Sequence, residues 1–151
     1  MTTTIADISF LRFPIVILAL LVFISTMLST KSGWHRIATR FPYKKIKDHT
    51  KYYFTRMSLG SGKFPVAYGG CVIVRLSPHG LGLSVIFLIR YMHRPIFIPW
   101  PEVFRCERDQ TGRYDVTKIS LHNEKSVFSF YGKVGENIYA SYVSENTNGK
   151  S

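Results

Sequence analysis

The sequence has few of the residues by which enzymes and metalloproteins are recognised. Its two cysteines, Cys71 and Cys106, lie far apart, so there is no CxxC motif and no disulfide framework. The five histidines are scattered, with neither an HExxH motif nor zinc-ligand spacing among them. Acidic residues number only nine in 151. We therefore predict no catalytic constellation, no metal site and no cofactor.

Apolar and aromatic side chains, in contrast, are abundant. Hydrophobic residues make up 46% of the chain and charged residues 19%, which is typical of a folded protein. Aromatic residues reach 15% and recur in short runs with Val and Ile, which favours strands.

One apolar run stands near the N-terminus. No charge occurs among the 18 residues from Phe13 to Thr30, a length of about 27 Å as a helix, which is enough to cross a bilayer core. Pro14 would lie in the first turn. The alternative is a cleaved signal peptide, but the preceding residues are not basic and no A-x-A-like site follows the run. The run therefore favours a transmembrane anchor.

The net charge of +11 is concentrated just after this run. Residues 31–63 hold nine Lys or Arg against one acid, whereas residues 64–151 hold ten against seven. Because Lys and Arg mark the cytoplasmic flank of a span, we expect the C-terminal part of the chain to be cytoplasmic.

The basic segment has three interpretations. Contact between anionic lipid headgroups and Lys44, Lys45 and Lys47 is the favoured one, because an anchor keeps the membrane close by. The same charges would also suit a role in topology alone. A nucleic-acid patch is the least favoured interpretation.

Two further places are candidate binding positions. Arg90 and Arg94 flank a short basic loop suited to a phosphate headgroup, although a solvated hairpin loop is the favoured interpretation. Trp100 stands between two prolines, either as a core residue or as a binding platform, and Trp34 follows the span as a structural or partner-binding aromatic.

The predicted fold class is α+β. A short helix after the span ends at Pro42, and the prolines of 95–102 favour an extended segment there. Alternating patterns predict two hairpins, one from strands 71–77 and 81–89 and one from strands 115–122 and 126–132, and an amphipathic helix over 133–143 follows. This pattern resembles a pleckstrin-homology (PH) or GRAM-type split barrel closed by a C-terminal helix. The predicted divisions are a tail (1–12), a transmembrane helix (13–30), a basic juxtamembrane linker (31–63), a β domain with its helix (64–144) and a disordered end (145–151).

Several short motifs carry a wider resemblance: Ser32-Gly33-Trp34, Phe41-Pro42, Gly80-Leu81, Leu83-Ser84, and His93 to Trp100 with Glu102. With these motifs the chain resembles a group of uncharacterised bacterial proteins with one N-terminal transmembrane helix and a small basic domain. The resemblance covers about residues 10–143 and implies a bacterial inner-membrane setting, but no activity.

The sequence thus favours a membrane-tethered, non-enzymatic interaction module that contacts anionic lipid, a membrane protein partner, or both. An accessory or assembly subunit of a membrane complex is the alternative, and an enzyme comes third.

Overall fold

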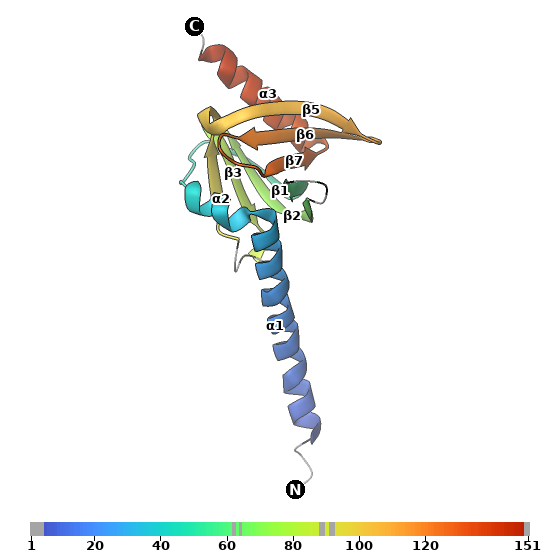
Figure 1. Ribbon diagram of the computed structural model, residues 1–151. Helices are drawn as coiled ribbons and strands as arrows, with labels where there is room; N and C mark the ends of the chain where they lie inside the picture. Colours follow the sequence, from blue (N-terminus) through green and yellow to red (C-terminus); the bar gives the residue numbers. More distant parts are fainter. Residues whose placement is uncertain (1–4, 62, 64, 88–89, 91–92, 150–151) are drawn as a thin grey trace.

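The structure, a computed structural model, describes residues 5–61, 63, 65–87, 90 and 93–149. Helix α1 (Ile5–Ser32) stands out from the rest of the molecule as a rod (Figure 1). Its 28 residues correspond to about 42 Å. The stretch Arg12–Ser32 is long and apolar enough to cross a membrane.

The start of α1 differs from the prediction. The sequence predicts that the helix begins at Phe13, but α1 begins at Ile5, so Pro14 lies inside the helix rather than in its first turn. A proline there removes one backbone hydrogen bond, which apolar membrane helices tolerate.

A glycine in a left-handed conformation separates α1 from α2 (Trp34–Arg40). Gly33 has a φ of +79°, and a Cβ at this position would lie 3.0 Å from Ser126 Oγ. The backbone N–H of Trp34 donates to Ser32 Oγ at 3.2 Å, which fixes the change of direction. As the sequence predicts, α2 ends just before Pro42.

The rest of the described chain forms a seven-stranded antiparallel sheet in the order β4-β3-β2-β1-β7-β6-β5. The strands are β1 (Thr50–Gly60), β2 (Val66–Ser77), β3 (Gly80–Val85), β4 (Ile96–Pro99), β5 (Val103–Thr111), β6 (Tyr114–Leu121) and β7 (Val127–Tyr131). The two predicted hairpins are β2–β3 and β6–β7.

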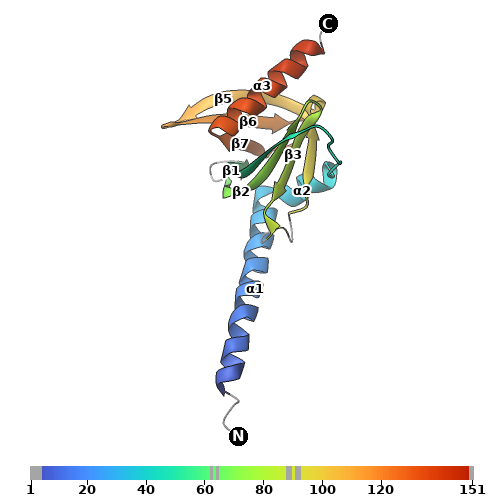
Figure 2. The same cartoon turned by 180° about the vertical axis from the view of Figure 1, so that it is seen from behind.

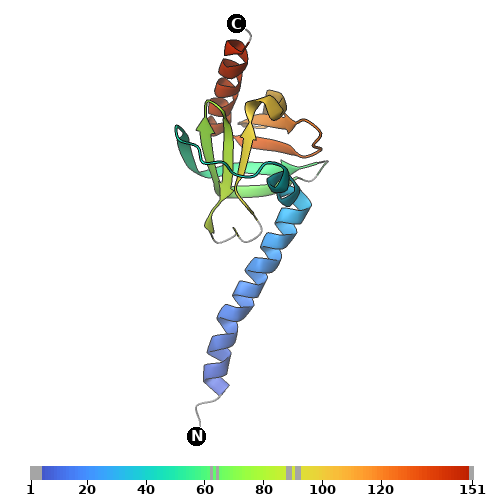
Figure 3. The same cartoon turned by 90° about the vertical axis from the view of Figure 1, so that its left-hand side faces the viewer.

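The sheet curls into a half-barrel (Figures 2 and 3). Strand β1 joins its two halves, because it pairs with β2 along most of its length and with β7 only from Met57 to Gly60. Its register shifts twice between Tyr52 and Met57, and Phe54 has a φ of +54°. Such bulges bend a strand and increase its twist.

Helix α3 (Lys133–Asn148) packs against β5, β6 and β7. Close approach requires Gly135, since a Cβ there would lie 2.7 Å from the Phe130 carbonyl oxygen and 2.9 Å from Thr117 Oγ1. Ile138 is fully buried against the sheet. The predicted α+β fold with an N-terminal apolar helix and a C-terminal helix is thus confirmed, although α3 continues past the predicted boundary at residue 144.

The core takes in much of residues 31–63. Trp34 and Ile37 of α2 are fully buried, as are Met57 and Leu59 of β1. Burying apolar surface of this kind is the main source of folding free energy. The segment predicted as a linker is therefore part of the folded domain.

Two shorter elements also differ from the prediction. The sequence predicts an extended segment over 95–102, but only β4 is extended, and a 3₁₀ turn, η2 (Trp100–Glu102), follows it. The φ that Pro101 imposes is compatible with such a turn. Strand β3 ends at Val85 instead of residue 89, and Leu88 and Ile89 lie outside the described residues.

Candidate functional site

A chain of buried polar side chains joins α1 to the sheet. Ser25 Oγ and His93 Nδ1 share a hydrogen bond of 3.3 Å, and His93 Nε2 is 3.0 Å from Tyr68 Oη. Tyr68 Oη in turn lies 2.9 Å from Ser32 Oγ. All four side chains are at most 1% exposed. We call these four residues the junction cluster; it begins and ends on α1 and spans the last two turns of that helix.

Burial governs the chemistry of this cluster. Removal from water raises the pKa of Tyr68 to about 12, although its hydrogen bond with Ser32 opposes the shift. Ser25 and His93 have the residue types of a nucleophile and its base. Both are buried against the domain, however, so a soluble substrate has no access to them.

Trp34 covers the junction cluster. It is fully buried, its indole Nε1–H donates to the Arg94 carbonyl oxygen at 2.9 Å, and its ring lies 5.6 Å from Tyr68 and 5.4 Å from His93. A buried indole whose N–H is bonded stabilises the surrounding core. The structure thus places Trp34 in the core.

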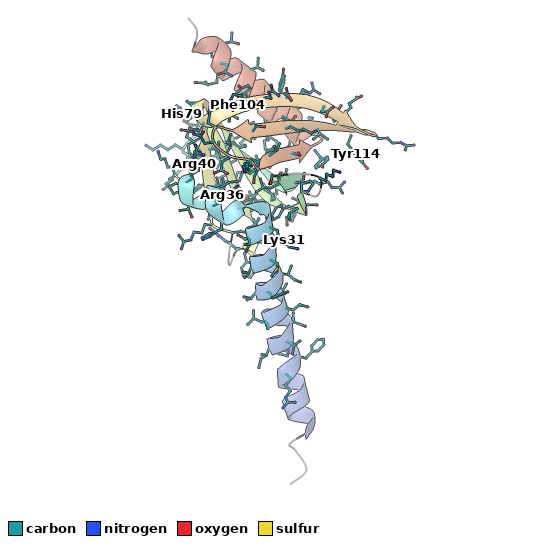
Figure 4. The ribbon with its side chains drawn as sticks, in the orientation of Figure 1. Lys31, Arg36, Arg40, His79, Phe104 and Tyr114 are labelled. Carbon is teal, nitrogen blue, oxygen red and sulfur yellow. The ribbon has the colours of Figure 1, made fainter. Side chains whose placement is uncertain are left out.

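Two arginines of α2 hold the turn between β6 and β7. Arg36 Nη2 lies 3.0 Å from Glu124 Oε2, and Arg40 Nη1 lies 3.5 Å from the other carboxylate oxygen. Arg40 also donates to the His122 carbonyl oxygen at 2.7 Å and lies 3.6 Å from Glu102. Figure 4 shows both arginines on α2, beside the end of α1 marked by Lys31. Part of the predicted basic segment is therefore engaged within the molecule.

The five predicted lipid-binding residues do not form one site. Arg90 and Arg94 are exposed and flank His93, whose side chain bonds to α1. Lys44, Lys45 and Lys47 are also exposed but lie on the segment between α2 and β1. Of these lysines, Lys44 lines a shallow groove at the opposite end of the domain.

That groove lies between the β2–β3 turn, η2 and the end of α3. Besides Lys44, its lining includes His79, Trp100 and Glu145. Figure 4 places His79 far from α1. Trp100 is only 3% exposed and its ring packs against Tyr142 at 6.1 Å, so it is mostly a core residue. Its Nε1–H has no hydrogen-bond partner among the described residues.

The cysteines are protonated at neutral pH. Burial raises the pKa of the Cys71 thiol, and burial together with the nearby charge of Glu107 raises that of Cys106 to about 12. Both thiols are free. Within the described ranges, no three His, Cys, Asp or Glu side chains gather as metal ligands would.

The junction cluster is not among the sites predicted from the sequence. Ser25, Ser29 and Ser32 follow the spacing of one helix face, so a polar stripe on an otherwise apolar helix was a usable signal. No local pattern marks Tyr68, which reaches Ser32 only through the curl of the sheet.

Comparison of the chain with protein-family models and with curated proteins finds no match.

Proposed function

We propose that this chain is a single-pass membrane protein whose α1 anchors a non-enzymatic, PH-like interaction domain to the membrane surface. One observation carries the proposal: α1 projects from the domain with its apolar side chains exposed, while its last two turns are bonded into the domain. Phe13, Leu18 and Phe23 are each at least 60% exposed. An apolar surface of this extent requires lipid or another apolar partner.

The same observation favours an anchor over a cleaved signal peptide. Cleavage after the apolar run would remove Ser25 and Ser29, which are buried against the domain. It would leave His93 without its bond to Ser25.

The orientation follows from the flanking charges. Arg12 is the only basic residue before the span, whereas Lys31, Arg36 and Arg40 follow it closely. We infer a cytoplasmic domain at the inner membrane of a bacterial cell. A reporter fused after Ser151 should then be active in the cytoplasm; activity in the periplasm would contradict this orientation.

The PH-like assignment is supported by the strand order and the closing helix. The half-barrel consists of strands β1–β4 and strands β5–β7, and α3 follows the last strand. Because hairpins dominate this arrangement, loops gather at its two ends, where binding surfaces usually lie.

We further propose that Arg90 and Arg94 contact anionic headgroups. Both are exposed and adjoin the segment that bonds to α1, and guanidinium groups suit phosphate. Lys44, Lys45 and Lys47 become the less favoured contacts, because Lys44 lies at the groove far from α1.

The test compares the full-length chain in nanodiscs of neutral lipid and in nanodiscs that also contain anionic lipid. Anionic lipid should raise the melting temperature of the domain, and added salt should reduce this increment. The double variant Arg90→Gln/Arg94→Gln should lose the increment. The matched control Lys44→Gln/Lys45→Gln/Lys47→Gln should keep it.

If the lysine variant loses the increment and the arginine variant keeps it, the assignment of the contact is wrong. If the wild type shows no increment even at low salt, the lipid-contact proposal fails. A protein partner, as in an accessory subunit of a membrane complex, then becomes the leading explanation of the exposed surface.

A further inference from the structure

The end of β3 and His93, which precedes β4, both reach the level of the last turns of α1. Figure 3 shows the end of β3 at that level. The hydrogen bond between His93 and Ser25 places His93, because Ser25 lies two turns, or about 10 Å, before the end of α1 at Ser32. His93 therefore lies at the level of the apolar span.

An exposed aromatic side chain occupies this level. Phe87 is 82% exposed, more than Phe13 on the apolar helix itself, which is 71% exposed. The backbone just before it is held, because the Ile86 N–H donates to the Cys71 carbonyl oxygen at 2.9 Å. An isolated exposed Phe is common on protein surfaces. This one lies two residues after the end of β3, which Figure 3 shows at the level of the last turns of α1.

Charged side chains flank the aromatic. Arg90 and Arg94 are both exposed in the same connection. Arginine places its apolar stem along apolar surface and keeps its guanidinium among polar groups. Apolar side chains accompanied by basic ones are typical of protein segments that lie in the boundary between headgroups and acyl chains.

We propose that Phe87, which follows the end of β3, is a second membrane anchor and inserts into the headgroup–acyl boundary of the leaflet that α1 enters. The inference rests on the proposed membrane anchoring by α1. It does not rest on anionic lipid, because insertion of Phe87 is apolar and should occur in neutral lipid as well. The domain would then be held to the membrane at two places.

The experiment measures the depth of single labelled positions in the full-length chain. Cys71 and Cys106 are replaced by serine, and an environment-sensitive NBD fluorophore is attached to Phe87→Cys, Met27→Cys or Phe104→Cys in nanodiscs of neutral lipid. Met27 is 45% exposed on α1 and reports lipid contact. Phe104 is 61% exposed and lies far from α1, so it is the matched aqueous control (Figure 4).

The label at Phe87 should show blue-shifted emission, and lipids spin-labelled near the headgroup should quench it. Spin-labelled lipids should also quench the label at Met27. The label at Phe104 should show neither. If the label at Phe87 behaves like that at Phe104 while Met27 is quenched, the second anchor is refuted and the anchoring by α1 stands. If Met27 also escapes quenching, the proposed anchoring itself fails.

A second variant covers a loss of folding in the serine background. The native thiols can be retained, because both are held protonated and react slowly at neutral pH. Phe87→Cys, being exposed, is then labelled preferentially, and the unsubstituted chain gives the background to subtract. Quenching at Phe87 that does not exceed this background would overturn the proposal.

Discussion

The two tryptophans of this protein mark two ends of the domain that are built differently. Trp34, beside α1, is fully buried and its Nε1–H is bonded to the Arg94 carbonyl oxygen. Trp100, at the end far from α1, is almost as buried, but its Nε1–H has no partner among the described residues. The comparison indicates that the indole beside α1 is held by a hydrogen bond as well as by packing, whereas the indole at the far end is held by packing.

The largest effect should follow from removing the covering side chain at the attachment. Trp34→Ala should lower the free energy of unfolding by about 3–5 kcal/mol, because it leaves a cavity and an unbonded carbonyl at Arg94. Denaturant titration of the full-length protein in micelles, followed by circular dichroism, would measure it. Phe104→Ala, an exposed control, should change little; equal losses would contradict the comparison.

Alkaline pH should lower the free energy of unfolding through Tyr68, at the end of the domain beside α1. The pKa of Tyr68 is raised from 10.0 to about 12 in the folded state, so the unfolded chain loses this proton first. Stability is therefore full below pH 10 and decreases by up to about 3 kcal/mol as the pH rises through about 12. The difference between wild type and Tyr68→Phe, measured across this range, isolates the contribution of Tyr68 from that of Cys106. Parallel pH curves for the two proteins would count against a buried Tyr68.

At neutral pH, Tyr68→Phe tests the hydrogen bonds alone. Loss of the hydroxyl leaves Ser32 and His93 each without one bond, which should cost about 1–3 kcal/mol. The same unfolding measurement applies, with Tyr114→Phe as the exposed control. A neutral result would show that the junction cluster contributes little to stability.

A smaller effect is expected at the far end. Trp100→Phe keeps most of the apolar volume and removes an N–H that is unpaired among the described residues, so it should cost less than about 1.5 kcal/mol. Trp34→Phe, which breaks a hydrogen bond, should cost more. If Trp100→Phe lowered the melting temperature more than Trp34→Phe, the contrast between the two ends would be wrong.

The smallest effect should come from the exposed lysines. Replacing Lys44, Lys45 and Lys47 by glutamine should alter the free energy of unfolding by no more than about 0.5 kcal/mol, since no ion pair involves them in the described structure. A larger loss would place these lysines in a structural role.

Local patterns predicted most of the fold but little of the attachment. The hairpins β2–β3 and β6–β7 and the end of α2 before Pro42 follow from alternation, turn residues and proline geometry. The lengths of α1 and α3 depend instead on packing and on an apolar environment. The periodicity of the sequence alone does not predict them.

The junction cluster and the split of the basic residues depend on tertiary pairing. His93 meets Ser25 across 68 positions in the sequence. The bridge between Pro42 and Ile96 directs the chain after α2 along β4, and Lys44 reaches the far groove. A sequence in which Lys44 follows Arg40 closely gives no sign that Arg40 pairs with Glu124 in the β6–β7 turn while Lys44 lines the groove at Trp100.

The turn at Gly33 connects the apolar helix to the domain without a flexible linker. A domain on a flexible tether samples many heights and orientations, and a partner must stop that motion when it binds. Here a single residue with a φ of +79° makes the connection. The conformational entropy of this connection is therefore lost when the chain folds and not when a partner binds. Under the proposed anchoring by α1, the groove at Trp100 would then stand at a fixed height and orientation above the membrane. A Gly/Ser segment inserted at residue 33 would abolish this fixed orientation.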